Sequence, residues 1–236
     1  MKWGMDMTKQ TKLMTALVLN VLVIVLEVAG LATCWGCGFG RFFEFYTDDS
    51  NVLALVSSIC YVVAAVLYLK DPEREIPHWV KVLRFCGSAV LMVTFLVVAF
   101  VLAPMAGMGG MGDMGGIETG STGLLAGYRL MAWMNEFKYF HLFCPLLSLV
   151  SFIFFEDGKW LRKADIPYTW IFTLIYGVIL VILNIVGVVS GPYPFLMVRE
   201  NPIFVSVLSV IGIFALIAFL GWALWKLNRK FAVSKE

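Results

Sequence analysis

Charged side chains are scarce in this sequence. Only 14% of the 236 residues are Asp, Glu, Lys or Arg, whereas a typical soluble domain contains about 25%. The formal net charge is only +2, so the chain lacks the basic surface with which proteins neutralise nucleic-acid phosphates. These shortages argue against an ordinary soluble domain and against a nucleic-acid partner.

Apolar runs take the place of the missing charge. Hydrophobic residues make up 61% of the chain. A helix needs about 20 residues to cross a hydrocarbon core of about 30 Å, and its backbone amides must be paired internally there. Runs of suitable length occupy 13–34, 51–69, 85–104, 139–155, 168–190 and 203–225. We therefore predict an all-α polytopic membrane protein in which residues 1–236 form a single domain of six transmembrane helices.

Lys and Arg are distributed unevenly over the expected loops. The N-terminal segment, the 70–84 and 159–163 loops and the C-terminal tail hold fourteen of them, whereas the alternate loops hold four. Because basic residues gather on the cytoplasmic side of membrane proteins, both termini are expected in the cytoplasm.

The predicted outer loop at 105–137 is rich in Gly and Met. Glycine raises the entropy cost of order, so we expect no stable helix or strand there, and a loop this long is typical of a lid or a disordered segment. Its methionines, at a spacing of three, would suit copper(I). We prefer an apolar loop that covers a pocket or lies on the membrane, because the predicted spans do not repeat such ligands. The methionines concerned are Met105, Met108, Met111 and Met114.

Cysteine and histidine give no metal site. Cys34 and Cys37 are expected outside, where they could form a disulfide or stay unpaired. The two histidines, His78 and His141, are expected on opposite sides of the membrane. No metal and no cofactor are predicted.

The few polar residues of the spans are expected near their outer ends. Such groups are costly at membrane depth, so a one-sided collection indicates a functional site. Its members are Glu27, Thr47, Ser50, Asn51, His141 and Asn184.

A hydroxyl and an imidazole at similar depth are the minimum parts of a nucleophile and its general base. Thr47 and His141 are the first candidates for these roles, and Asn51 or a backbone amide could stabilise an oxyanion. Other interpretations remain: Thr47 and Ser50 could cap a helix, and His141 could anchor at the headgroups. Cys144 shares a helical face with His141 and is a second candidate nucleophile.

Three motifs resemble one known family. Tyr46-Thr47 with Ser50-Asn51-Val52-Leu53, then Tyr139, His141 and Pro145, then Gly191-Pro192-Tyr193-Pro194-Phe195-Leu196 occur in an order that resembles the family of the androgen-induced and androgen-dependent TFPI-regulating proteins, and its bacterial relatives most of all.

The resemblance implies an intramembrane threonine hydrolase that cleaves lipid esters such as fatty acid esters of hydroxy fatty acids. It places the reactive threonine at Thr47 and the histidine at His141. Asn51 directly follows Ser50, one position later than the family pattern has it, so Ser50 stays a second candidate nucleophile. A bacterial plasma membrane, with the site on the extracytoplasmic side, is the implied location.

The predicted function is therefore hydrolysis of a membrane lipid or acyl ester, with Tyr193 and Phe195 lining the substrate entrance. One alternative is a small transporter or channel, in which Glu27 and Asn184 line the pathway. Another is a membrane scaffold without enzymatic activity. The sequence predicts no oligomeric state.

Overall fold

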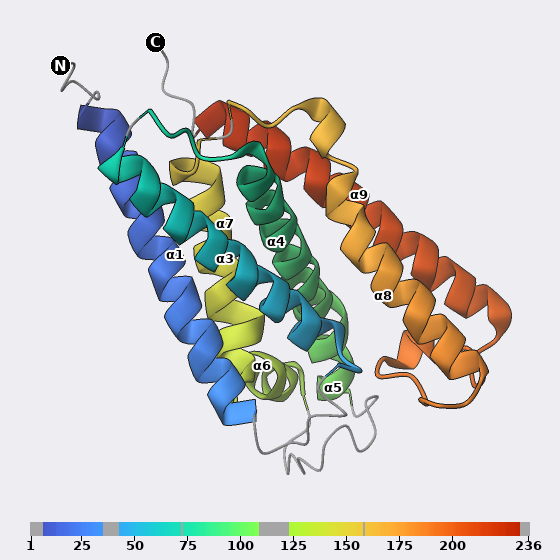
Figure 1. Ribbon diagram of the computed structural model, residues 1–236. Helices are drawn as coiled ribbons and strands as arrows, with labels where there is room; N and C mark the ends of the chain where they lie inside the picture. The colour runs from blue at the N-terminus through green and yellow to red at the C-terminus, as the bar shows by residue number, and fades with distance from the viewer. Residues whose placement is uncertain (1–6, 35–42, 72, 109–122, 158, 232–236) are drawn as a thin grey trace.

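The computed structural model describes residues 7–34, 43–71, 73–108, 123–157 and 159–231 (Figure 1). Regular secondary structure in these ranges is helical throughout. The α-helices are α1 (Met7–Cys34), α3 (Tyr46–Lys70), α4 (His78–Val97), α5 (Ala103–Gly107), α6 (Leu124–Trp133), α7 (Cys144–Val150), α8 (Tyr168–Ile185) and α9 (Ile203–Phe231). Three π-helical turns, η2 (Val98–Leu102), η3 (Tyr139–Phe143) and η4 (Ser151–Phe155), extend α4 and both ends of α7, and η5 (Lys163–Asp165) and η6 (Pro194–Leu196) are short 3₁₀ turns.

Helices α1, α3, α4 and α7 pack into a four-helix bundle, because α1 and α4 each contact both α3 and α7. Helices α8 and α9 form a hairpin against α4 (Figure 1). The Lys12 ammonium donates to the Phe231 carbonyl at 3.3 Å, so α1 begins at the end of the bundle where α9 finishes.

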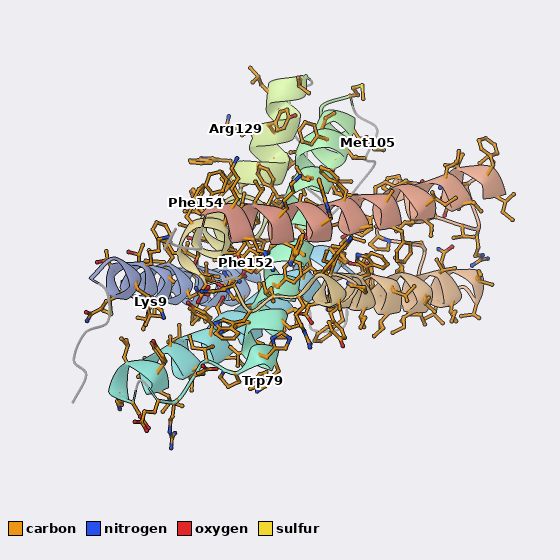
Figure 2. All side chains as sticks on the ribbon, turned by 90° about the horizontal axis from the view of Figure 1, so that it is seen from above. Lys9, Trp79, Met105, Arg129, Phe152 and Phe154 are labelled. Carbon is orange, nitrogen blue, oxygen red and sulfur yellow. The ribbon has the colours of Figure 1, made fainter. Side chains whose placement is uncertain are left out.

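Helix α1 shows why these apolar sequences pack as they do. Ala16, Asn20, Val23 and Glu27 follow one another at spacings of three and four and are fully buried, which makes them one helical face. The remaining faces are also apolar and stay exposed, as at Val25. A helix that is apolar all round is typical of a membrane span. Figure 2 shows the same contrast on η4, where Phe152 lies inside the bundle and Phe154 at its edge.

Five helices have the length and composition of membrane spans. They are Lys9–Thr33, Tyr46–Lys70, His78–Gly107, Lys163–Ile185 and Ile203–Phe231. The expected run at 139–155 is also helical, but Tyr139–Phe155 is a shorter apolar helix. The all-helical fold with several candidate spans is thus confirmed, whereas the number six and the cytoplasmic termini stay predictions.

The predicted lack of structure across 105–137 is wrong for the described parts of that segment. Residues 103–107 and 124–133 form α5 and α6, which lie side by side at one end of the bundle (Figure 1). A Cβ on Gly127 would meet the Gly107 backbone nitrogen at 2.6 Å. The glycine that argues against a helix in isolation here permits close contact between two helices.

Candidate functional site

Thr47 and His141 are in contact. Nε2 of His141, in η3, lies 3.3 Å from Oγ1 of Thr47, in the first turn of α3. The His141 ring is almost fully buried and stacks on the Phe137 ring at a centroid separation of 5.0 Å and an interplanar angle of 9°. The structure therefore brings together a hydroxyl and an imidazole from segments far apart in the chain.

Helix α3 begins at Tyr46, about one turn before the apolar run that predicted it. The N-cap position falls on Phe45, and no side-chain hydrogen bond caps the helix. The interpretation of Thr47 and Ser50 as caps is therefore wrong, since both lie inside the helix. The first amides of a helix have no partner within it and favour negative charge, so Thr47 lies where an oxyanion would be stabilised.

Asn51 supports both members of the pair. Its Nδ2 atom donates to the carbonyl of Thr47 at 2.7 Å and to the carbonyl of Phe140, next to His141, at 3.5 Å. Its amide protons are thus directed at the backbone, and Asn51 joins the start of α3 to η3. The role of Asn51 as an oxyanion donor stays a prediction. Ser50 is fully buried, donates to the Thr47 carbonyl at 2.9 Å and lies 2.8 Å from the Thr94 hydroxyl.

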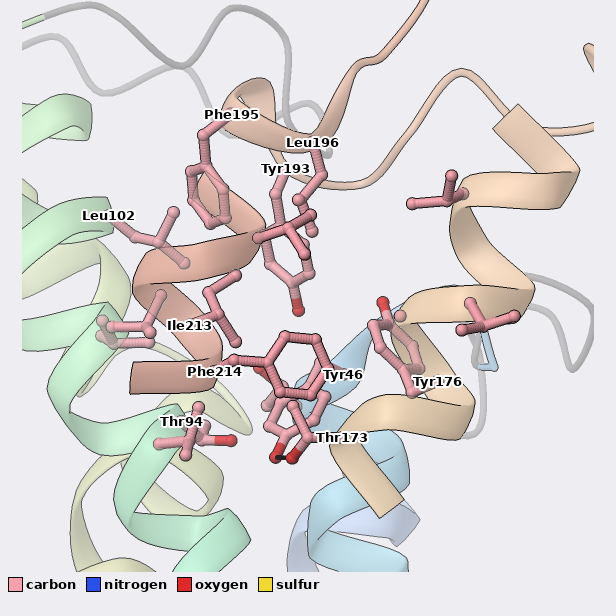
Figure 3. Close-up of a pocket in the computed structure, with 18 of the residues that line it drawn as sticks. Tyr46, Thr94, Leu102, Thr173, Tyr176, Tyr193, Phe195, Leu196, Ile213 and Phe214 are labelled. Atoms are coloured by element: carbon pink, nitrogen blue, oxygen red, sulfur yellow. Dashed lines mark hydrogen bonds between the residues drawn. The ribbon is translucent and has the colours of Figure 1, made fainter. Parts of the chain in front are cut away.

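A cavity of about 340 Å³ adjoins Thr47 (Figure 3). Its walls come from α3, α4, η2, α8, α9 and η6. Nearly all of the exposed lining is carbon. The Tyr46 hydroxyl and the Thr173 hydroxyl form a 2.8 Å hydrogen bond in its wall. The Thr47 hydroxyl, which contacts His141, thus lies beside a hydrophobic cavity.

Tyr193 and Phe195 both line this cavity, and their rings stack at 5.5 Å. Burial raises the pKa of Tyr193 to about 12, opposed by hydrogen-bonding interactions with the Thr47 side chain and with the backbone of Thr47 and Tyr46. The phenol is therefore neutral near pH 7, and it lies beside the Thr47 hydroxyl.

The remaining predicted site residues lie elsewhere. Glu27 is fully buried on α1 and interacts with Cys144 of α7. Asn184 holds the end of α8: it donates to the Val189 carbonyl at 3.1 Å and accepts from the Arg199 amide at 3.3 Å. The prediction that Asn184 lies near one end of its span is confirmed, because α8 ends one residue later, at the last residue of the candidate span.

A second polar layer lies at the opposite end of the bundle. The Arg84 guanidinium is fully buried and forms a 3.1 Å ion pair with Glu156. Asn20 donates to Glu156 at 3.0 Å, and Ser151 donates to it at 2.8 Å. Asn228 of α9 donates to the Glu156 carbonyl at 2.8 Å. The predicted confinement of polar groups to one end is therefore wrong.

The sequence contained a signal for this layer. Asn20, which belongs to this layer, precedes Glu27 by seven residues and therefore lies on the same helical face. The sequence thus shows a second polar side chain on that face, two turns away from Glu27. The charge pattern predicts that Arg84 lies in the cytoplasmic 70–84 loop, but α4 already begins at His78.

Some predictions fall on parts of the chain outside the described residues. These are the pairing of Cys34 with Cys37, because neither side chain is described, and the copper interpretation at Met111 and Met114. Among the described residues, no group of three His, Cys, Asp or Glu side chains could hold a metal ion.

Comparison with known proteins found no match: no family model, curated protein or solved structure is similar to this chain. The family resemblance of the three motifs therefore stays a prediction.

Proposed function

We propose that this chain is an intramembrane hydrolase of lipid esters in which Thr47 is the nucleophile and His141 the general base. The observation that carries the proposal is the 3.3 Å contact between Oγ1 of Thr47 and Nε2 of His141, with Thr47 itself on the wall of a hydrophobic cavity. Ligand sites are commonly concave and apolar with a few convergent polar groups. The predicted orientation places this site on the extracytoplasmic side of a bacterial plasma membrane.

In the first half-reaction, Oγ1 of Thr47 attacks the ester carbonyl while Nε2 of His141 takes the hydroxyl proton. The tetrahedral intermediate collapses, the bond to the alcohol oxygen breaks, and His141 returns the proton to the leaving alcohol. In the second half, His141 takes a proton from water, whose oxygen attacks the acyl-threonine. As the second tetrahedral intermediate collapses, the bond between the acyl carbon and Oγ1 breaks, His141 returns its proton to Oγ1, and the fatty acid is released.

The developing oxyanion would lie near the start of α3. The backbone groups of Tyr46 and Thr47 that interact with the Tyr193 hydroxyl are the first of that helix. Together with the neutral Tyr193 phenol, they form a group of donors beside the nucleophile. Loss of one such donor typically costs about 10²–10³ in rate.

Labelling of the purified protein by a fluorophosphonate probe, with lipid-ester hydrolysis as the second measurement, tests this proposal. We expect Thr47→Ala to abolish labelling and His141→Ala to slow it by at least about a hundredfold, the usual contribution of a general base. Ser50→Ala and Cys144→Ala are the matched controls and should retain labelling. Loss of labelling in Ser50→Ala alone would move the nucleophile, and a folded wild type that neither labels nor hydrolyses esters would refute the proposal.

The polar layer around Arg84 favours proton-coupled transport as a second candidate function. Ionisable residues inside membrane proteins commonly mark proton or ion pathways. Among the described residues, neither carboxyl oxygen of Glu27 and neither terminal nitrogen of Arg84 has a hydrogen-bond partner of normal geometry. An apolar layer that includes Ala54, Leu91 and Cys144 contacts Glu27 through Cys144 and would have to open for transport.

Proton flux into liposomes that contain the protein tests this candidate. Transport predicts flux in the wild type, its loss in Glu27→Gln and its retention in Glu73→Gln, which removes an exposed loop carboxylate. Absence of flux in a preparation that still labels at Thr47 would leave hydrolysis as the function.

A further inference from the structure

The lining of the cavity beside Thr47 extends along α8. On that helix the lining runs from Thr173 to Ile182, a distance of nine helical steps or about 14 Å at the helical rise. Tyr193, Phe195 and Leu196 close the end near η6. An apolar space that extends this far along a helix fits a hydrocarbon chain better than a compact polar molecule.

The α8 wall of the cavity faces the surroundings of the protein. Val178 and Ile182 line the cavity and are nevertheless 49% and 54% exposed. Both belong to a candidate membrane span, so their exposed surfaces would face lipid. A chain from the bilayer could therefore reach the cavity past α8 without first crossing water.

Gly177 lies at the middle of this wall. It lines the cavity between Tyr176 and Val178, and a Cβ built on it meets no heavy atom within 4 Å. A glycine inside a helix is destabilising compared with alanine, and no close backbone contact explains this one. The open space at Gly177 instead widens the cavity.

We propose that this cavity binds one acyl chain of a membrane lipid, which enters sideways past α8, and that Gly177 determines which chains are accepted. The role of the bound chain as the acyl half of an ester substrate rests on the proposed function, whereas its binding does not. The Leu side chain of Gly177→Leu would occupy the space that the chain needs. Overpacking of this kind costs enough free energy to weaken binding by about tenfold.

The test is photolabelling in detergent micelles with a long-chain saturated fatty acid that carries a diazirine. Wild type, Gly177→Leu and Gly177→Phe are compared with Gly212→Leu. Gly212 is also a membrane-span glycine with open space around it, but it lies on the exposed face of α9 outside the cavity lining. We expect labelled peptides from α8 and α9, labelling reduced about tenfold in both Gly177 variants, and wild-type labelling in Gly212→Leu.

Equal labelling of wild type and both Gly177 variants would overturn the inference, as would labels confined to peptides outside the cavity. Hydrolysis of short-chain and long-chain esters is measured on the same preparations. Wild type that binds the probe but hydrolyses no ester would refute the hydrolase and leave the acyl site standing. Wild type that hydrolyses esters while Gly177→Leu keeps its binding and chain-length preference would refute the acyl site alone.

Discussion

The Nε2 atom of His141 lies 3.3 Å from Oγ1 of Thr47, although the two residues are 94 positions apart. Asn51 links the two backbone segments that carry this contact, because its Nδ2 atom donates to the carbonyl of Thr47 and to the carbonyl of Phe140, the residue before His141. The geometry of the pair therefore depends on a third residue that need not touch a substrate.

Asn51→Ala should lower kcat by at least about tenfold and change KM little. Displacement of a catalytic group by about 1 Å can cost 10²-fold in rate, and the substitution removes the bonds that join α3 to η3. Steady-state kinetics on a soluble ester checks this. Asn184→Ala is the control, because it also removes two amide hydrogen bonds but acts at the end of α8. An equal fall in kcat for both variants would argue for a general loss of stability instead of a positioning role.

The sequence predicted the helical class and the Thr47–His141 pair because both depend on strong local signals. An apolar run of about 20 residues can cross a membrane only as a helix or as part of a closed barrel. A single histidine at the boundary of such a run is easy to identify in an otherwise apolar sequence. The precise start of α3 was not predictable, since the helix begins with Tyr46, Thr47 and Asp48, which resemble a loop in composition.

The positions of Arg84 and of the contact between α5 and α6 depend on tertiary packing, which the sequence patterns do not show. Arg84 directly precedes an apolar run, so its charge indicated a loop. Its actual position depends on Glu156, 72 residues later, whose carboxylate makes burial of the guanidinium tolerable. Likewise, the contact between α5 and α6 at Gly107 and Gly127 depends on two helices meeting, which no single segment specifies.

Tyr193→Phe should lower kcat by about tenfold or more without unfolding the protein. The substitution removes the hydroxyl beside Thr47 but keeps the ring that packs on Phe195, and a lost oxyanion donor slows acyl transfer. Tyr176→Phe is the matched control, because Tyr176 also lines the cavity but donates to the Glu44 carbonyl at 2.7 Å. Unchanged kcat in Tyr193→Phe would leave the backbone amides of α3 as the oxyanion donors.

The pH dependence follows from the same tyrosine. A tyrosine is a neutral donor below its pKa, and the pKa of Tyr193 is raised to about 12. Ionisation of Tyr193 should therefore cause no loss of kcat as the pH rises from about 7 to about 10, the ordinary tyrosine value. A pH–rate profile of the wild type that falls in this range, together with a flat profile of Tyr193→Phe, would contradict the assignment.

Arg84→Met should destabilise the protein by about 3–5 kcal/mol, because it leaves the buried Glu156 carboxylate without its charged partner. Glu156→Gln in the same chain should recover much of this loss, since a neutral amide needs no counter-charge. Unfolding in a detergent titration gives both values, and the double-mutant cycle gives the coupling. Additive effects of the two substitutions would mean that the 3.1 Å ion pair contributes little.

Gly30→Ala tests how closely α1 supports the position of His141. A Cβ at this position would lie 2.9 Å from Cζ of Phe140 and closer still to its Cε1 atom. Phe140 is fully buried and directly precedes His141, so relief of the clash must shift the Phe140 ring, and we expect η3 to shift with it. Replacing Gly30 by alanine stabilises the helix by up to about 1 kcal/mol through helix propensity. Overpacking of a core costs about 1–3 kcal/mol, so the net effect on the stability of the protein should be unfavourable. We expect a lower melting temperature and slower labelling at Thr47 than in Gly212→Ala, whose new methyl meets nothing within 4 Å. If Gly30→Ala instead melts higher and labels normally, α1 yields at this contact and does not fix the position of His141.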